Sequence, residues 1–246
     1  MRRTALSGAV VLICAVSVML AQAGQQPVEP KGKVRVLVTS GGHPFDPKGF
    51  FAMWDSFAGI AWREGKMSKE TADAFTAENL KDCDVVVTFD MAQNMTDEQK
   101  QALLDFIKRG GGLVVLHHSL ASWQNWPDYE RIIGGRFLLT SATREGKLIP
   151  RSTSKNGLKL NIQIANRNHP ITQGMEDFVI PDEGYRGYIV RPDVRVLLTT
   201  DNPDNNKEVA WVRREGKAPI AMIQLGHDNK AWSDPNYRKI VERAVM

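Results

Sequence analysis

Cysteine is scarce in this chain of 246 residues, which contains only Cys14 and Cys83. Cys14 lies within a segment that we predict to be removed, so the mature chain would keep Cys83 alone and could form no internal disulfide. A domain of roughly 200 residues buries enough apolar surface to fold without one. Cys83 comes just before a predicted strand, and we expect it to be a small buried hydrophobic side chain, with a catalytic thiol as the alternative.

The apolar stretch Ala5–Leu20 is short for a membrane span, which needs about 20 apolar residues. Arg2 and Arg3 precede this stretch and Ala21-Gln-Ala23 follows it, which is the pattern of a secretory signal peptide. We therefore predict a signal peptide over residues 1–23, cleaved near Ala23, and a linker over residues 24–33. The mature protein would be periplasmic or extracellular and free of the membrane, whereas an uncleaved anchor is the alternative.

Neither sign of charge is concentrated in the chain. It has 32 basic and 28 acidic residues, which gives a net charge of +4, and the basic residues are scattered. Such a distribution argues against nucleic acid and anionic membranes as partners and leaves a small molecule as the expected partner. The length suits a single domain over residues 34–246, and nothing in the sequence indicates an oligomeric state.

Several catalytic and cofactor motifs are missing. Gly110-Gly-Gly112 is not followed by Lys-Ser/Thr and precedes a strand, so it is no phosphate loop, and we expect no nucleotide cofactor. Ser119 lacks the flanking glycines of a nucleophile elbow. The sequence contains no HExxH or CxxC spacing that would identify a metal site directly.

Strand and helix patterns alternate in the first half of the chain. Strands are expected at 34–39, 84–89 and 113–116, and helices at 50–60, 96–110 and 126–137, the second of these helices beginning with a capping box at Thr96. The second half adds strands at 158–164, 194–199, 208–213 and 219–225. We predict an α/β fold with a mostly parallel central sheet, helices on both faces and β insertions in the second half, of flavodoxin-like or amidotransferase-like topology.

Histidine is the residue type that points to a site. His43 follows the first strand, His117 and His118 end the central strand, His169 lies in a turn, and His227 follows the last strand. The carboxyl ends of parallel strands lie at one edge of a sheet, so we expect His43 to lie near His117 or His118. His227 would join them if its strand runs in the same direction. The alternative for each histidine is a hydrogen-bonded structural role.

Glu183, in Asp182-Glu-Gly-Tyr185, is the carboxylate most suited to these histidines. We predict His117, Glu183 and His227 as catalytic residues, because a carboxylate beside imidazoles suits acid–base chemistry near neutral pH. The same three side chains could hold a divalent metal such as zinc. We expect the Glu183 segment to be a polar turn, and a solvated turn without function is the alternative.

Aromatic residues flank the predicted turns and suit the stacking of sugar rings. We predict that the substrate is bound by His43, His118, Trp126, Tyr185 and Trp232. Packing in the core is the alternative for the aromatic members.

Taken together in order, six pieces of the chain resemble the ThuA-like, or trehalose-utilisation, family. They are Gly110–His117, Trp126–Phe137, Asn168–Gly174, Asp182–Tyr185, Val196–Thr199 and Gln224–Trp232. The resemblance implies a class I glutamine amidotransferase-like fold and a link to disaccharides or their keto-sugar forms. The family lacks the amidotransferase cysteine, and His117 and His118 occupy that region here. Many relatives have small residues after the first histidine, so the resemblance leaves open which imidazole faces the pocket.

The sequence leaves two functions open. One is an enzyme that acts on a glycoside or keto-sugar through a His/Glu site, with or without the help of a metal. The other is a non-catalytic sugar-binding module on a degenerate amidotransferase-like fold. A working glutaminase is disfavoured, because Cys83 precedes its strand and cannot stand at the elbow.

Overall fold

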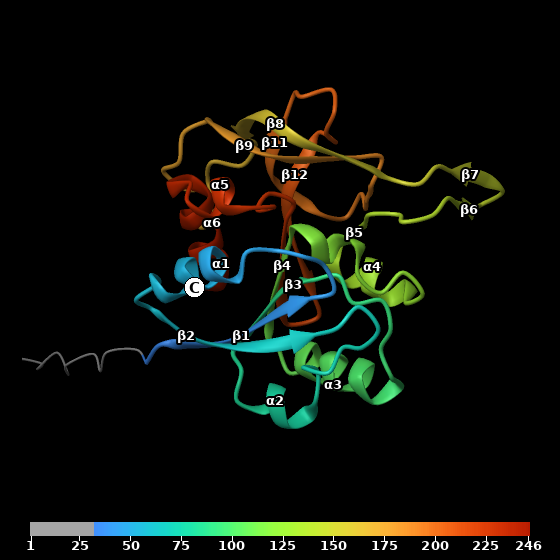
Figure 1. Cartoon of the computed structure of the whole chain (residues 1–246), viewed down its shortest axis with the longest axis vertical. Coiled ribbons are helices and arrows are strands. Elements are labelled where there is room, and N and C mark those ends of the chain that lie inside the picture. Colours follow the sequence, from blue (N-terminus) through green and yellow to red (C-terminus); the bar gives the residue numbers. More distant parts are fainter. Residues whose placement is uncertain (1–31) are drawn as a thin grey trace, which may run out of the picture. The chain divides into compact units, whose positions relative to one another are not determined.

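Nine strands form one sheet in the order β2-β1-β3-β4-β13-β12-β11-β8-β9 in this computed structural model, which describes residues 32–246 (Figure 1). The predicted signal peptide and residues 24–31 of the predicted linker lie outside the described residues. The first five strands in that order run parallel: β2 (Ile60–Met67), β1 (Val34–Gly41), β3 (Val85–Asp90), β4 (Gly112–Leu116) and β13 (Ala218–Ile223). The other four are antiparallel: β12 (Glu208–Glu215), β11 (Arg195–Thr200), β8 (Thr153–Ile164) and β9 (Phe178–Arg186).

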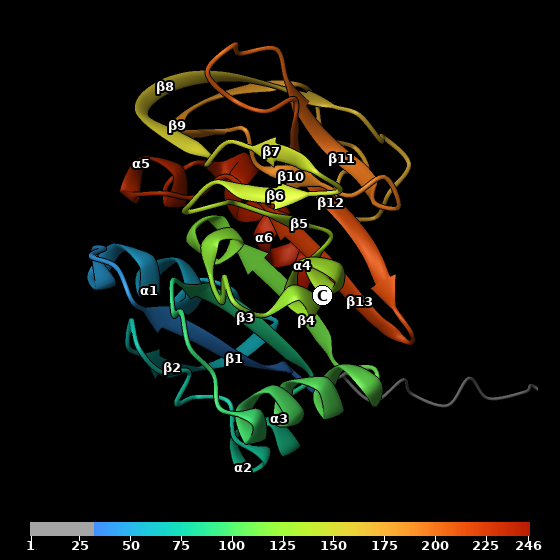
Figure 2. The same cartoon turned by 90° about the vertical axis from the view of Figure 1, so that its right-hand side faces the viewer.

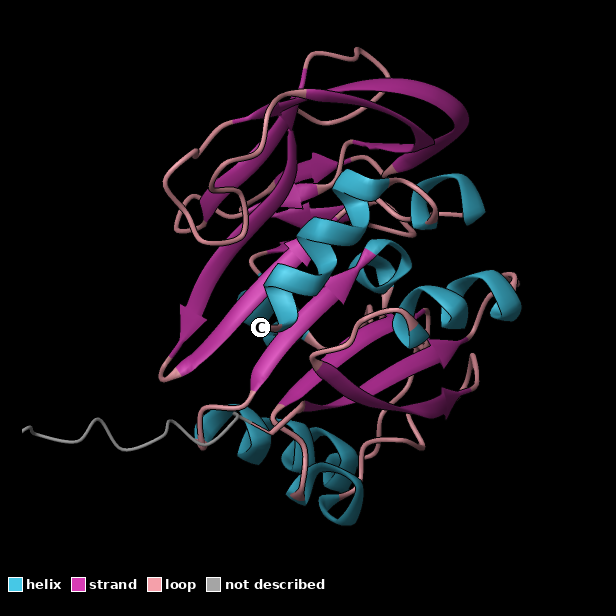
Figure 3. Cartoon of the chain, turned by 90° about the vertical axis from the view of Figure 1, so that its left-hand side faces the viewer, coloured by secondary structure: helices cyan, strands magenta, loops and turns pink. Residues whose placement is uncertain are grey.

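Helices cover both faces of the parallel part of the sheet, as Figure 3 shows. One face packs against α1 (Pro47–Asp55), α5 (Asn229–Trp232) and α6 (Pro235–Val245). The other packs against α2 (Ala77–Lys81), α3 (Asp97–Lys108) and α4 (Pro127–Ile133). The buried strands read as near-continuous apolar runs because both of their faces are covered, and β3 and β4 are buried at every position. The predicted fold class is confirmed.

Insertions in the second half extend this core. The short strands β5 (Gly135–Arg136) and β10 (Ile189–Val190) pair with each other, and β6 (Ala142–Arg144) and β7 (Lys147–Ile149) form a hairpin. This hairpin projects from the sheet in Figure 1 and points toward the viewer in Figure 2. The predicted β insertions are therefore present.

The prediction of a helix over 50–60 is wrong at its end. Helix α1 stops at Asp55, and Ile60 begins the edge strand β2, which pairs with β1. The polar side chains of β2, such as Arg63 and Lys66, interrupt its apolar pattern because an edge strand needs little burial. By contrast, the Thr96 capping box forms as predicted, with both reciprocal hydrogen bonds to Gln99. Within residues 32–246, no helix is long and apolar enough to span a membrane.

Curvature of the antiparallel part brings its last strand back toward β4. In a flat sheet, β9 would lie five strand spacings, about 24 Å, from β4. Nevertheless, a side-chain atom of Glu183 on β9 lies 3.0 Å from a ring nitrogen of His117, directly after β4. The sheet therefore curls over the carboxyl end of its parallel core, and the candidate site lies in the space that it encloses.

Candidate functional site

The central strand ends in a sharp turn at His117. Strand β4 stops at Leu116, and a short 3-10 helix, η1, begins at His117 and runs to Ala121. His117 has a φ of +37°, a conformation that non-glycine residues rarely adopt and that costs about 1–3 kcal/mol. A strand-to-helix turn with a strained residue is the geometry of a nucleophile elbow, and here it holds an imidazole.

His117 is fully buried, and both of its ring nitrogens face oxygen atoms. Nδ1 contacts the main-chain carbonyl oxygen of Gln224, and Nε2 lies 3.0 Å from Oε2 of Glu183. A carbonyl oxygen only accepts, so Nδ1 carries a proton. The contact between Nε2 and Oε2 can then be satisfied by a proton between the two atoms or by a cation that both of them bind. The pair is therefore suited to holding a proton or a cation inside the protein.

Glu183 lies within β9, so the prediction of a polar turn at Asp182–Tyr185 is wrong. The carboxylate is not solvated: Glu183 is 7% exposed. Burial raises the pKa of Glu183, but the hydrogen bond and charge of His117 and the charge of His227 outweigh it, so the pKa lies below its ordinary value. Oε2 of Glu183 also lies 3.8 Å from Nε2 of His227, so the carboxylate stands between two imidazoles.

His227 follows β13, which runs parallel to β4, so the condition for its joining the other histidines is met. The preceding Gly226 has a φ of +111°, and a Cβ there would lie 2.1 Å from the Tyr237 hydroxyl oxygen. Asp182 holds this loop in place, because its carboxylate accepts from the backbone N–H groups of Gly226, at 2.7 Å, and of His227, at 3.0 Å. Asp182 thus fixes the backbone of His227 relative to β9.

His43 and His118 lie toward the surface of the same cluster. Their ring centroids are 3.6 Å apart, and His118 is 4.6 Å from His117 and 5.4 Å from His227 by the same measure. Burial, followed by the charges of neighbouring imidazoles, lowers the pKa of His118. Burial also lowers the pKa of His43, and both imidazoles are therefore neutral near pH 7. Nδ1 of His118 lies 3.3 Å from the hydroxyl of Tyr185, whose ring covers His117.

Three of these imidazoles could hold a metal ion. One ring nitrogen from each of His117, His118 and His227 lies within 4.8 Å of the others. Oε2 of Glu183 lies 3.0 Å and 3.8 Å from ring nitrogens of two of them. Ligands about 2.0–2.1 Å from a tetrahedral zinc are roughly 3.3 Å apart, so the carboxylate separations suit a shared ion. The Nδ1–H of His117 on a backbone carbonyl is the usual outer contact of a ligating histidine.

Not every predicted residue reaches the cluster. The ring of Trp126 is buried against Trp123 and Tyr129, on the core face that also carries α4. Trp232 is buried, and its indole N–H donates to the carbonyl of Gly226 at 2.8 Å, next to His227. Roles for the two tryptophans in binding stay predictions.

His169 lies in the turn between β8 and β9. It lines a different pocket, together with residues at the amino ends of β4 and β13 such as Gly112 and Pro219. Cys83 is buried, as predicted, and burial raises the pKa of its thiol. Ser119 is fully buried. Its hydroxyl accepts a hydrogen bond from the main-chain N–H of Asp90 and donates one to the carbonyl oxygen of Asp90.

Two site residues escaped the sequence reasoning. Asp182 clamps the His227 loop, and Gln224 offers its carbonyl to His117 while its side-chain amide donates to the carbonyl of Glu183 at 2.9 Å. Asp182 and Gln224 both lie inside sequence pieces that resemble the ThuA-like family. Their position in those pieces was the signal in the sequence that could have identified them. Their roles depend on contacts between β9 and the segment after β13, which no local pattern reveals.

Comparisons with known proteins identify the fold type and the family of the chain. The fold is of the class I glutamine amidotransferase type. Residues 33–246 match the family model ThuA, described as trehalose utilisation, so the chain belongs to the ThuA family. No match was found among curated protein sequences.

Solved structures show the same fold at low identity. A ThuA-like protein from Parabacteroides merdae superposes with a TM-score of 0.70 at 16% identity, covering 87% of this chain and 88% of that one. A ThuA-like protein from Bacteroides uniformis gives 0.65 at 18%, covering 90% and 94%. PurLQS from Thermotoga maritima gives 0.54 at 12%, covering 86% and 97%. These likenesses establish the fold, and the family match places the chain in a context of carbohydrate utilisation.

Proposed function

We propose that the chain is an enzyme that acts on a glycoside or keto-sugar through the His117–Glu183–His227 unit. The observation that carries the proposal is a buried carboxylate between two imidazoles, 3.0 Å from one and 3.8 Å from the other. Such a unit holds and moves protons near neutral pH. The family's link to trehalose utilisation supports a sugar substrate.

Exposure divides the roles among the three side chains. The side chain of His227 is 29% exposed, whereas those of Glu183 and His117 are 8% and 0% exposed. A group that exchanges a proton with substrate must touch it, so His227 is the proton-transferring residue. Glu183 orients that imidazole and balances its charge, and His117 holds Glu183 in place. His43 and His118 line the approach and contact the substrate.

On a keto-sugar, the imidazole of His227 takes the proton from the carbon beside the carbonyl, and the C–H electron pair forms the enolate. Loss of the glycosidic oxygen from the adjacent carbon forms the unsaturated ketone, and the same proton passes to the departing oxygen. As an alternative to proton transfer by His227, the imidazoles of His117 and His227 and the carboxylate of Glu183 would hold a divalent metal such as zinc, which would polarise a substrate carbonyl when bound. Export to the periplasm or beyond, following the predicted signal peptide, would place the enzyme where external disaccharides arrive.

Turnover by matched histidine variants tests the proposal. The wild type is screened against native and oxidised disaccharides, and the active substrate is then given to His117→Ala, His227→Ala and His169→Ala. Loss of the acid–base unit should lower kcat by about 10²–10⁴-fold in the first two variants. His169→Ala, which removes an imidazole remote from the cluster, should keep wild-type activity.

Unchanged turnover in His117→Ala and His227→Ala would overturn the mechanism. Binding of disaccharide without turnover, insensitive to both substitutions and to a chelator, would favour the sugar-binding module instead. Circular dichroism of each variant establishes that the fold is intact.

A further inference from the structure

A small groove opens beside His227. It has a volume of about 240 Å³ and is built by two loops that leave the carboxyl ends of β1 and β13. The residues that line it are Pro44, Phe45, Asp46, His227, Asp228, Asn229, Lys230 and Trp232. His227 belongs both to this groove and to the imidazole cluster, so a molecule in the groove lies next to the proposed reacting centre.

The two walls of the groove are fastened to each other. The side-chain amide of Asn229 donates to Oδ2 of Asp46 at 2.5 Å, which joins the start of α5 to the start of α1. Gly49 permits this contact, because a Cβ at that position would lie 1.6 Å from Oδ1 of Asn229. Asp46 and Asp228 cap α1 and α5 through their Oδ1 atoms. The groove therefore exists before any ligand arrives.

Several polar groups in the groove remain available to a ligand. Oδ2 of Asp228 accepts no hydrogen bond from residues 32–246 and lies 4.0 Å from Nδ1 of His227. Within residues 32–246, the ammonium of Lys230 has no ion pair or side-chain hydrogen bond. The ring of Phe45, which packs against His43 and Phe89, contributes an apolar wall. An acceptor, a donor and an aromatic face are what a ring with many hydroxyl groups requires.

We propose that this groove binds the second, unreacted ring of a neutral disaccharide, which would be the leaving ring; this assignment rests on the proposed function. The volume equals that of about eight water molecules, which suits one sugar ring rather than two. Two carboxylates and one ammonium line the groove, so its charge disfavours a phosphorylated sugar. The remaining ring of the substrate would then lie at His227 and Glu183.

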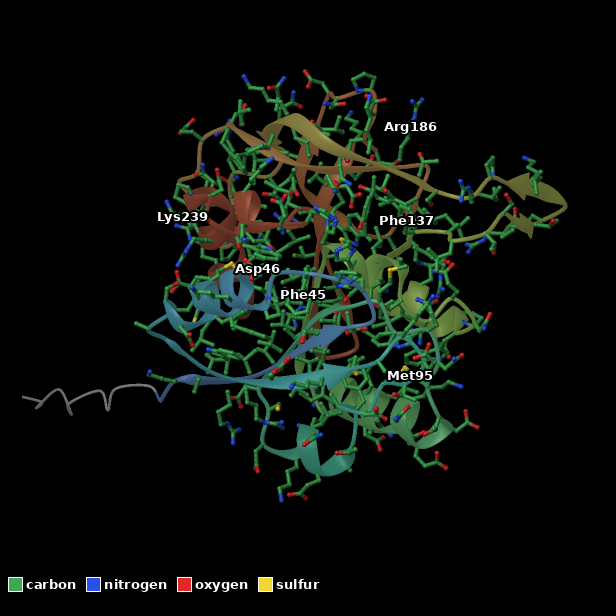
Figure 4. The ribbon with its side chains drawn as sticks, viewed as in Figure 1. Phe45, Asp46, Met95, Phe137, Arg186 and Lys239 are labelled. Atoms are coloured by element: carbon green, nitrogen blue, oxygen red, sulfur yellow. The ribbon has the colours of Figure 1, made fainter. Side chains whose placement is uncertain are left out.

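Calorimetric titration with methyl α-glucoside, a neutral single-ring probe, tests the assignment. Asp228→Asn keeps the helix cap but removes the charge, and Lys230→Ala removes the donor. Each should weaken binding by about tenfold, the effect of losing one hydrogen bond to a charged group. Lys239→Ala on α6 is the matched lysine control and should bind as the wild type does, because Lys239 (labelled in Figure 4) does not line the groove.

His117→Ala separates this proposal from the proposed function, because it should lose turnover yet bind methyl α-glucoside normally. Glucose 6-phosphate should bind more weakly than the glucoside. Absence of glucoside binding by the wild type, binding by both groove variants as tight as that of the wild type, or tighter binding of the phosphorylated sugar would each overturn the assignment. Turnover unaffected in His117→Ala would contradict the catalytic mechanism alone.

Discussion

Two buried carboxylates, Asp182 within β9 and Asp90 at the end of β3, show how differently single residues are used. Asp182 contacts the loop of the imidazole cluster, whereas Asp90 ends β3 and fastens β1 to η1. Oδ2 of Asp90 accepts from the hydroxyl of Thr39 at 2.5 Å, and Oδ1 accepts from Ser122 at 3.2 Å. Sequence reasoning found the histidines, because their residue type and strand-end positions are local. The strained φ of His117 and the partners of these aspartates depend on tertiary contacts and could not be predicted.

Asp90 should make stability depend on pH. Burial, opposed by the hydroxyl hydrogen bonds, raises its pKa to about 6 from the ordinary 3.8. The folded state then binds the proton more tightly than the unfolded state does, so stability falls as pH rises from about 4 to about 6 and is level above that. The contribution is about 3 kcal/mol. Urea unfolding should show a smaller difference between pH 4 and pH 7 in Asp90→Asn than in wild type, and equal differences in the two proteins would contradict this role.

Among the elements, those with strong local signals were predicted correctly and those at the sheet edges were not. Helix α3 is recognisable in the sequence from its capping box and apolar stripe. Strands β3 and β4 are recognisable from their apolar runs. Strand β2 was not predicted, and its first residue Ile60 was taken as the end of a helix. The Glu183 segment of β9 was taken as a turn. Polar residues interrupt the apolar patterns of both strands. In β9 the interrupting residues, Asp182 and Glu183, are polar because they form part of the site. The carboxylates that made the strand hard to recognise in the sequence therefore also explain its function.

Contact between β9 and the loop after β13 should depend on Asp182. In Asp182→Asn the backbone N–H groups of Gly226 and His227 would face an amide, which offers them one oxygen instead of two. We expect affinity for zinc to fall by about 10–100-fold, the usual effect of losing an outer contact of a metal site.

Asp90→Asn is the matched control for that variant, since it alters a buried carboxylate whose hydrogen bonds go to Thr39, Ala92 and Ser122 and not to the His227 loop. It should keep wild-type affinity for zinc. An identical loss of zinc affinity in both variants would indicate general destabilisation and not a positioning role for Asp182.

For the whole molecule, the parallel core and its helices were predictable because alternating apolar patterns specify them. The meeting of His43, His117 and His118 followed from the geometry of parallel strands. The place of Glu183 did not, because it requires the antiparallel strands to curl until β9 lies over β4. That curvature converts a row of imidazoles into an enclosed site, with a carboxylate on one side and the groove at His227 on the other.

The most direct test of this account is the titration of metal-free protein with zinc, comparing the wild type with His227→Ala. His169→Ala serves as the control that removes a histidine elsewhere. The account predicts one bound ion per chain in the wild type and the control, and an affinity at least about tenfold weaker in His227→Ala. Failure of the wild type to bind zinc, or equal binding by all three proteins, would contradict the claim that these side chains form one site.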